Sequence, residues 1–143
     1  MRREIVSRII EILKNDAELA EKVKYFYFGR PVKALDWPFI VVEPAAIGGD
    51  NIAERAHGYW RHVFRVNILI YARSVVPDEA EKEALDLAEH ALGVIMAGDV
   101  TELVKLRSTF NIYPVALNPE PPLAEGEYLV VIQRLTLEAW WLE

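Results

Sequence analysis

The chain contains no cysteine, which excludes a disulfide framework, a thiolate metal site and a cysteine nucleophile. It also lacks a long uncharged apolar run, because stretches such as residues 39–42 fall far short of the roughly 20 residues that a membrane-spanning helix needs. The basic start at Arg2 and Arg3 is followed by further charges at Glu11 and Lys14, so we expect no signal peptide. These absences predict a soluble, intracellular protein with no membrane partner.

Basic residues are fewer than acidic residues in this chain. The chain has 16 Lys and Arg against 22 Asp and Glu, which gives a formal net charge of −6. A general nucleic-acid binder usually has the opposite balance, so we expect no specific nucleic-acid partner. The 143 residues are 52% hydrophobic and include four Trp, six Tyr and five Phe. This length and composition predict one folded domain, residues 1–143, with a core of its own.

The first half of the chain changes its hydrophobic period. Residues 2–15 carry apolar side chains at helical spacing, and Asp16 is placed to cap a further helical turn over residues 17–23. Aromatic residues 24–28 and the apolar run 39–43 are typical of strands. Residues 45–58 are expected to be a flexible connection or the tip of a long hairpin.

The second half has a strand, a helix and two more strands. Residues 59–73 alternate with a period of two, which predicts a long strand with one face on a core and the other facing water or a neighbouring subunit. Residues 77–97 predict an amphipathic helix, with Asp78 and Glu81 in capping-box spacing. Residues 105–115 and 127–142 predict strands, separated by a stiff proline-rich loop at residues 116–126.

The order of the expected elements is α-β-β-β-α-β-β. Connections of hairpin length dominate, which indicates an α+β fold: a mostly antiparallel β-sheet with two helices packed on one face.

The sequence contains no recognisable catalytic or metal-binding pattern. His57, His62 and His90 have no spacing that would converge three or four ligands on zinc. No serine lies in a nucleophile motif, and Gly48-Gly49 lacks a phosphate-binding fingerprint. The acidic residues 78–83 are better explained as a solvated helix start than as a pair of catalytic carboxylates. We therefore expect a non-enzymatic protein with no cofactor and no metal.

The layout resembles a group of tailed-phage proteins, the tail terminator or tail-completion proteins of the lambda type. The resemblance is one of pattern over nearly the whole chain: an amphipathic helix that runs into a helix–Asp–x–x–Leu opening, a short aromatic strand with a Gly-Arg-Pro turn, a Pro followed by an apolar strand, a long central strand, a helix and a closing strand. The segments that carry it are residues 13–19, 23–31, 37–42, 67–71, 77–97 and the strand that ends at Leu142. The resemblance implies an α+β subunit of a ring, commonly a hexamer, that caps the finished tail tube and offers a surface to the head. The implied partners are other copies of the chain, the tail tube and head–neck proteins, and the implied location is the cytoplasm during assembly and then the virion.

Two sets of residues are candidates for the contacts that such a ring would make. The apolar outward face of the last strand is a candidate subunit interface: Tyr128, Val130, Ile132 and Trp140. The two long loops are candidates for contacts with a partner: Gly48, Gly49, Asp50, Asn51, Pro119, Pro121 and Pro122. Three alternatives remain open: a neighbouring head–tail neck protein, a small-molecule-binding module or enzyme of the α+β class with a pocket beside the sheet, and a nucleic-acid binder that uses Arg61, Arg65 and Arg73.

Overall fold

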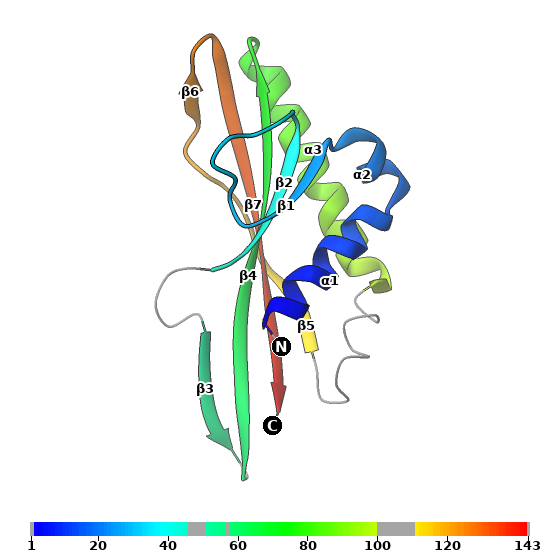
Figure 1. The fold of residues 1–143 in the computed structure, drawn as a ribbon, viewed down its shortest axis with the longest axis vertical. Coiled ribbons are helices and arrows are strands. Elements are labelled where there is room, and N and C mark those ends of the chain that lie inside the picture. The colour runs from blue at the N-terminus through cyan, green and yellow to red at the C-terminus, as the bar shows by residue number, and fades with distance from the viewer. Residues whose placement is uncertain (1, 46–50, 57, 100–110, 143) are drawn as a thin grey trace.

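A computed structural model describes residues 2–45, 51–56, 58–99 and 111–142 of the chain. The protein is a mixed α+β domain in which a long, twisted sheet carries a layer of helices (Figure 1). The helical elements are α1 (Arg2–Asn15), α2 (Ala17–Lys22), α3 (Pro77–Val94) and the π-helical turn η1 (Ile95–Asp99). The α+β class expected from the sequence is confirmed.

The described part of the chain contributes seven strands to one sheet. They are β1 (Tyr25–Phe28), β2 (Phe39–Pro44), β3 (Asn51–Ala56), β4 (Tyr59–Ser74), β5 (Asn111–Pro119), β6 (Leu123–Glu125) and β7 (Tyr128–Leu142). The strand order is β1-β2-β4-β7-β5, with β3 paired to one end of β4 and β6 to one end of β7. The pair β1–β2 is parallel, and the other described pairs are antiparallel.

The element order is richer than the sequence predicts. The turn after Asp16 is a separate helix, α2. The connection at residues 45–58 contains β3, which pairs with β4 as a hairpin. The proline-rich segment at residues 116–126 contains the end of β5 and all of β6. Each added element is short or lies at an edge of the sheet, where the hydrophobic pattern is weakest.

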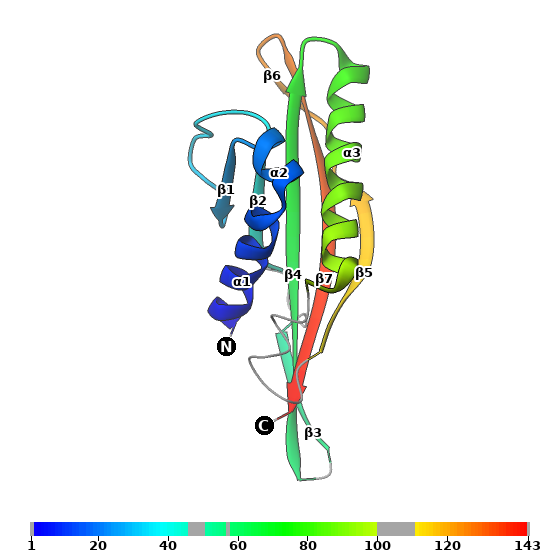
Figure 2. The same ribbon diagram turned by 90° about the vertical axis from the view of Figure 1, so that its right-hand side faces the viewer.

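One face of the sheet packs against the helices. Alternate residues of β4 point to this helical face and meet the matching residues of β7, as in the pair Ile68 and Leu135, both fully buried. α1 and α3 cover this face from opposite margins of the sheet (Figure 2). The helical side chains buried there include Ile5, Ile9, Leu13, Leu87 and Ala91. The two helices therefore share a single main core.

The opposite face of the sheet carries a second apolar cluster. Its buried members are Phe39, Val41, Leu69, Val130 and Ile132. No described helix packs there; Ala34 and Trp37 of the β1–β2 connection, together with Tyr27, pack against the cluster. β4 is therefore buried on both of its faces in this part of the sheet.

The start of α3 differs from the capping box expected at Asp78 and Glu81. The helix begins at Pro77, and Val76 occupies the cap position without a side-chain hydrogen bond. Ser74 stabilises the turn instead: its Oγ accepts a bond from the Val76 amide (3.0 Å) and donates one to Glu79 (3.2 Å). The capping-box prediction is wrong because Pro77, whose fixed φ suits the first helical position, places Asp78 inside the first turn.

β5 lies later in the chain than expected. The sequence predicts a strand at residues 105–115 and a loop afterwards, whereas β5 spans Asn111–Pro119, and residues 105–110 lie outside the described residues. Pro114 is accommodated because β5 is an edge strand in the described sheet and its register shifts between Pro114 and Ala116. A bulge of this kind permits a proline inside a strand.

Candidate functional site

A histidine on α3 bridges two carboxylates from the region of α2. His90 Nε2 lies 2.6 Å from Asp16 Oδ2, and His90 Nδ1 lies 3.1 Å from Glu18 Oε2. Asp16 also caps α2, because its Oδ2 accepts a hydrogen bond from the Leu19 amide at 3.0 Å. The Asp16 carboxylate thus caps the start of α2 and also links α2 to α3.

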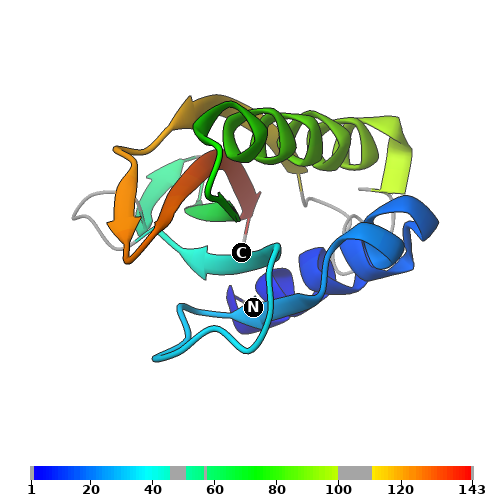
Figure 3. The same cartoon turned by 90° about the horizontal axis from the view of Figure 1, so that it is seen from above.

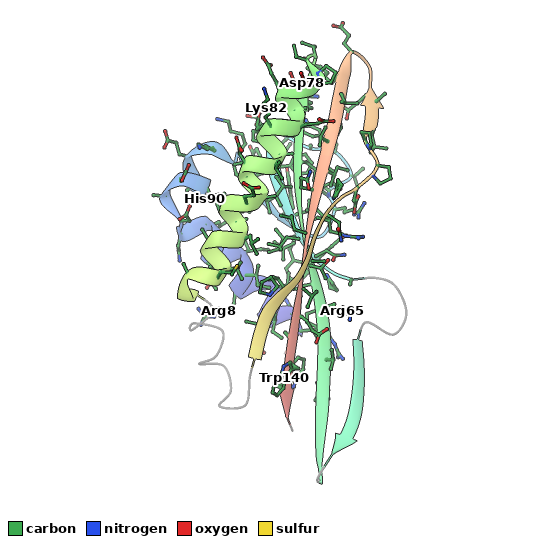
Figure 4. The ribbon with its side chains drawn as sticks, turned by 180° about the vertical axis from the view of Figure 1, so that it is seen from behind. Arg8, Arg65, Asp78, Lys82, His90 and Trp140 are labelled. Carbon is green, nitrogen blue, oxygen red and sulfur yellow. The ribbon has the colours of Figure 1, made fainter. Side chains whose placement is uncertain are left out.

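The two helices border a groove with a volume of about 920 Å³. Leu19 and Leu87, both buried, form part of its lining, and six carboxylates outnumber three lysines around it. The carboxylates are Glu18, Glu21, Glu79, Glu83, Asp86 and Glu89. His90 lies on the side of α3 that faces the N-terminal helices (Figure 4). We call this feature the α2–α3 groove; its net charge is negative whether or not His90 is protonated.

The pKa values around the groove are shifted in both directions. The pKa of Asp16 is lowered, first by the Leu19 amide and then by the contact with His90. The pKa of Glu18 is lowered by its hydrogen bond to Lys22 and by the charge of His90, and the pKa of Lys22 is raised by Glu18. Burial raises the pKa of Glu83. Hydrogen bonds and then ion pairing thus stabilise the charged carboxylates on the α2 side, whereas partial desolvation disfavours the charge of Glu83.

The geometry at His90 does not suit a single metal ion. The two carboxylates contact opposite nitrogens of the imidazole. A metal ion bound to one ring nitrogen could therefore also be held by Asp16 or by Glu18, but not by both. Among the described residues, no group of three or more His, Asp or Glu is placed to hold a metal. The arrangement is better suited to binding a cationic or hydrogen-bonding group than to metal chemistry.

The candidate interface residues of the last strand lie in different environments. Val130 and Ile132 belong to the buried cluster on the opposite face of the sheet, with 3% and 2% of their surface exposed. Tyr128 is exposed, and Trp140 is partly exposed. The structure therefore leaves Tyr128 and Trp140 accessible and places the middle of the predicted interface inside the chain.

The candidate partner-contact loops are described only in part. Gly48, Gly49 and Asp50 lie outside the described residues, and Asn51 begins β3. Pro119 ends β5, and Pro121 and Pro122 are exposed between β5 and β6. The structure does not bring the described members of the two loops into one site.

The arginines considered for nucleic-acid binding have partners within the chain. Arg65 lies 3.2 Å from Glu138 across the β4–β7 pair. The guanidinium of Arg73 lies 4.8 Å from the centroid of the Trp37 ring, 4.4 Å from that of Tyr128 and 3.7 Å from Glu125. The side chain of Arg61 is outside the described set. The two described arginines therefore do not form a free cationic platform.

His62, the other described histidine, does not join the groove. His62 stacks on Trp141, with ring centroids 5.1 Å apart and an interplanar angle of 9°. His57 lies outside the described residues. The contact between His90 and Asp16 escapes sequence reasoning because 74 positions separate the two residues and no motif links them. Only the cap position of Asp16 is visible in the sequence.

Comparison with known proteins adds no family assignment. No protein-family model matches the chain, and no curated protein matches it. A search of the described residues finds no helix both long and apolar enough to cross a membrane.

Proposed function

We propose that the protein is a non-enzymatic assembly subunit of the tail-terminator type. It forms a homo-oligomeric ring, a hexamer, that caps a phage or provirus tail tube and joins it to the head. It acts in the cytoplasm during assembly and then remains in the virion.

The observation that carries the proposal is the order of the elements. The following elements come in the same order along the chain as those on which the resemblance rests: α1 and the Asp16 cap, the aromatic β1 with its Gly-Arg-Pro turn, the apolar β2, the long β4, α3 and the closing β7. A mostly antiparallel sheet with its helices on one face also suits a ring subunit, since β1 and β5 lie at the two margins of the described sheet, where contacts with neighbouring subunits can form. The excess of acidic residues is compatible with a lumen that lets DNA pass without holding it.

Exposed apolar side chains support self-association. They occur at separate places on the surface, and those with more than half of their surface exposed are Phe28, Val32, Leu35, Val75, Met96 and Leu123. Separate patches are what a head-to-tail ring requires, because each subunit uses two different surfaces.

The test is the mass in solution, measured by light scattering behind a sizing column over a concentration series. The proposal expects a discrete species near six times the 16.4 kDa chain, and a ring in negative-stain micrographs. A monomer at every concentration that also fails to bind isolated tail tubes would contradict it.

The α2–α3 groove favours one second candidate, a module that binds a small cationic molecule. Polar groups converge there around a concavity of about 920 Å³, as a binding site requires. Calorimetry with spermidine as the probe separates the two candidates. The binding module would be favoured if the protein stays monomeric and binds spermidine saturably, and if Glu83→Lys abolishes this binding.

A further inference from the structure

Two exposed apolar side chains project from the connection between β1 and β2. Val32 is fully exposed, at 109% of its reference surface, and Leu35 is 73% exposed, with Lys33 exposed between them. Isolated exposed apolar residues are ordinary, but two large ones beside a lysine on one short connection form a projecting feature that a partner can bind. We call these three residues the β1–β2 knob.

The knob is held in place by its own connection. The amide of Leu35 donates a hydrogen bond to Tyr27 Oη at 3.2 Å, and Ala34 and Trp37 pack into the cluster on the opposite face. At the start of the connection, Arg30 Nε lies 3.1 Å from Glu43. A segment anchored in this way loses little conformational entropy when it binds, which favours its use as a recognition element.

The α2–α3 groove complements the knob in charge and in lining. Six carboxylates against three lysines surround the groove, and buried leucines contribute to it. Asp86 and Glu83 make no ion pair within the described residues, in contrast to Glu43, Glu120 and Glu138 on the sheet. A lysine flanked by apolar residues fits such a lining, since the ammonium can meet carboxylates while the apolar side chains pack on the aliphatic stems of the Lys and Glu side chains that line the groove.

The knob cannot reach the groove of its own chain. Seen from above, the β1–β2 connection extends from the molecule on the side away from α3 (Figure 3). Two different surfaces that complement one another but point in different directions form a head-to-tail contact between copies.

From these observations we infer that the β1–β2 knob of one copy docks in the α2–α3 groove of the next. This contact deepens the proposed function, on which it rests: it names the surface through which the subunits of the ring recognise one another. Lys33 supplies the charge contact, and Val32 and Leu35 supply the apolar contact.

A charge-swap experiment tests the contact. The knob variant is Lys33→Glu, and the groove variant combines Glu83→Lys with Asp86→Lys. Each variant places like charges across the contact, so each is expected to raise the concentration for half-assembly by about tenfold or more. An equal mixture is expected to assemble again, because each contact in an alternating ring then joins opposite charges.

Controls separate docking from folding and from net charge. Glu127→Lys changes an exposed residue of the β6–β7 turn that belongs to neither the knob nor the groove lining, and is expected to assemble like the unmodified chain. Val75→Ser is the matched control for Val32→Ser, because both remove an exposed valine and only the second lies in the knob. Near-ultraviolet circular dichroism of every variant checks that the fold is retained.

Each outcome decides one point. If the unmodified chain forms a ring and both charge variants assemble equally well, the groove contact is overturned and the ring proposal stands. If the variants dissociate but their mixture does not reassemble, the pairing of knob with groove is overturned. If the unmodified chain is monomeric throughout and ignores tail tubes, both the contact and the proposed function are overturned.

Discussion

His90 Nε2 on α3 lies 2.6 Å from Asp16 Oδ2 at the start of α2, and 74 positions separate the two residues. The same carboxylate oxygen accepts the hydrogen bond from Leu19 that caps α2. Asp16 therefore joins a local function, the helix cap, to a long-range one, the attachment of α2 to α3. Because α2 has only six residues, it depends on such contacts for its stability.

A double-mutant cycle on this pair should show coupling. We expect Asp16→Ala to lower the free energy of unfolding by about 1 kcal/mol through loss of the cap. His90→Ala should lower it by about 0.5–1.5 kcal/mol, because its hydrogen bonds are only partly buried. The double variant should lose less than the sum, since both changes remove the same contact. Urea unfolding measures the free energy of the two single variants and of the double variant. The combination of Glu21→Ala with His90→Ala is the control, and its effects should be additive. Strict additivity of Asp16→Ala and His90→Ala would contradict the contact.

The lowered pKa of Asp16 predicts a dependence of stability on pH. A carboxyl whose pKa is lower in the folded state than in the unfolded state stabilises the fold when ionised, so its contribution is present above its ordinary value of 3.8 and is lost as the pH falls through the lower folded value. Asp16→Asn retains a capping oxygen but cannot ionise. We expect the stability advantage of the unmodified chain over Asp16→Asn to shrink as the pH falls below about 4. An advantage that stays constant down to about pH 2 would contradict the assignment.

Glu83 should behave in the opposite way. Burial raises the pKa of Glu83, so its ionised form is less favourable in the folded chain than in the unfolded chain. We expect Glu83→Gln to stabilise the protein slightly at neutral pH, and the gain to disappear as the pH falls below the ordinary value of 4.5. Glu127→Gln, at an exposed turn, is the matched control and should change little. Thermal unfolding at several pH values measures both; destabilisation by Glu83→Gln at neutral pH would show that the carboxylate has a favourable partner.

Sequence periodicity predicts the long elements and misses the contacts between them. The bounds of α1 and the helix-facing residues of β4 and β7 follow from a period of 3.6 or 2 and agree with the structure. β3 and β6 have no such pattern and form because a neighbouring strand supplies hydrogen bonds. The buried state of Val130 and Ile132 is hidden for a similar reason: alternation shows that they face away from the helices, but not that Trp37 and its connection cover them.

The candidate site was less accessible to sequence reasoning than the fold. Asp16 is recognisable as a cap, whereas nothing near His90 in the sequence identifies its partners. The groove is formed by two helices that are distant in the chain. In the sequence, the charged residues of each helix are typical of an ordinary solvent-exposed helix face. Tertiary packing alone brings Glu18 and His90 together.

β4 offers a test of the two-sided sheet. Ile68 and Leu69 are adjacent and fully buried, but Ile68 faces the helices and Leu69 faces the cluster beneath the β1–β2 connection. We expect both Ile68→Ala and Leu69→Ala to lower the free energy of unfolding by about 2–5 kcal/mol, because each leaves a cavity. Val75→Ala, at an exposed residue, should change it by less than about 0.5 kcal/mol. A cost confined to Ile68→Ala would mean that the second face is open to solvent.

Arg73 should stabilise the cover of the second face. Its guanidinium lies 4.8 Å from the centroid of Trp37, in the β1–β2 connection, and 4.4 Å from that of Tyr128, in β7. Two cation–π contacts at partly exposed rings predict that Arg73→Ala lowers the free energy of unfolding by about 1–2 kcal/mol. It should also change the near-ultraviolet circular dichroism of the protein, since the Trp37 ring loses a group that packs against it. Arg8→Ala, which breaks an exposed pair with Glu11, is the control and should cost at most about 0.5 kcal/mol with no spectral change.

Because Trp37 packs beside the segment that carries the β1–β2 knob, Arg73→Ala should also weaken self-assembly without altering the knob itself. An unchanged spectrum and unchanged assembly would show that Arg73 does not order the connection.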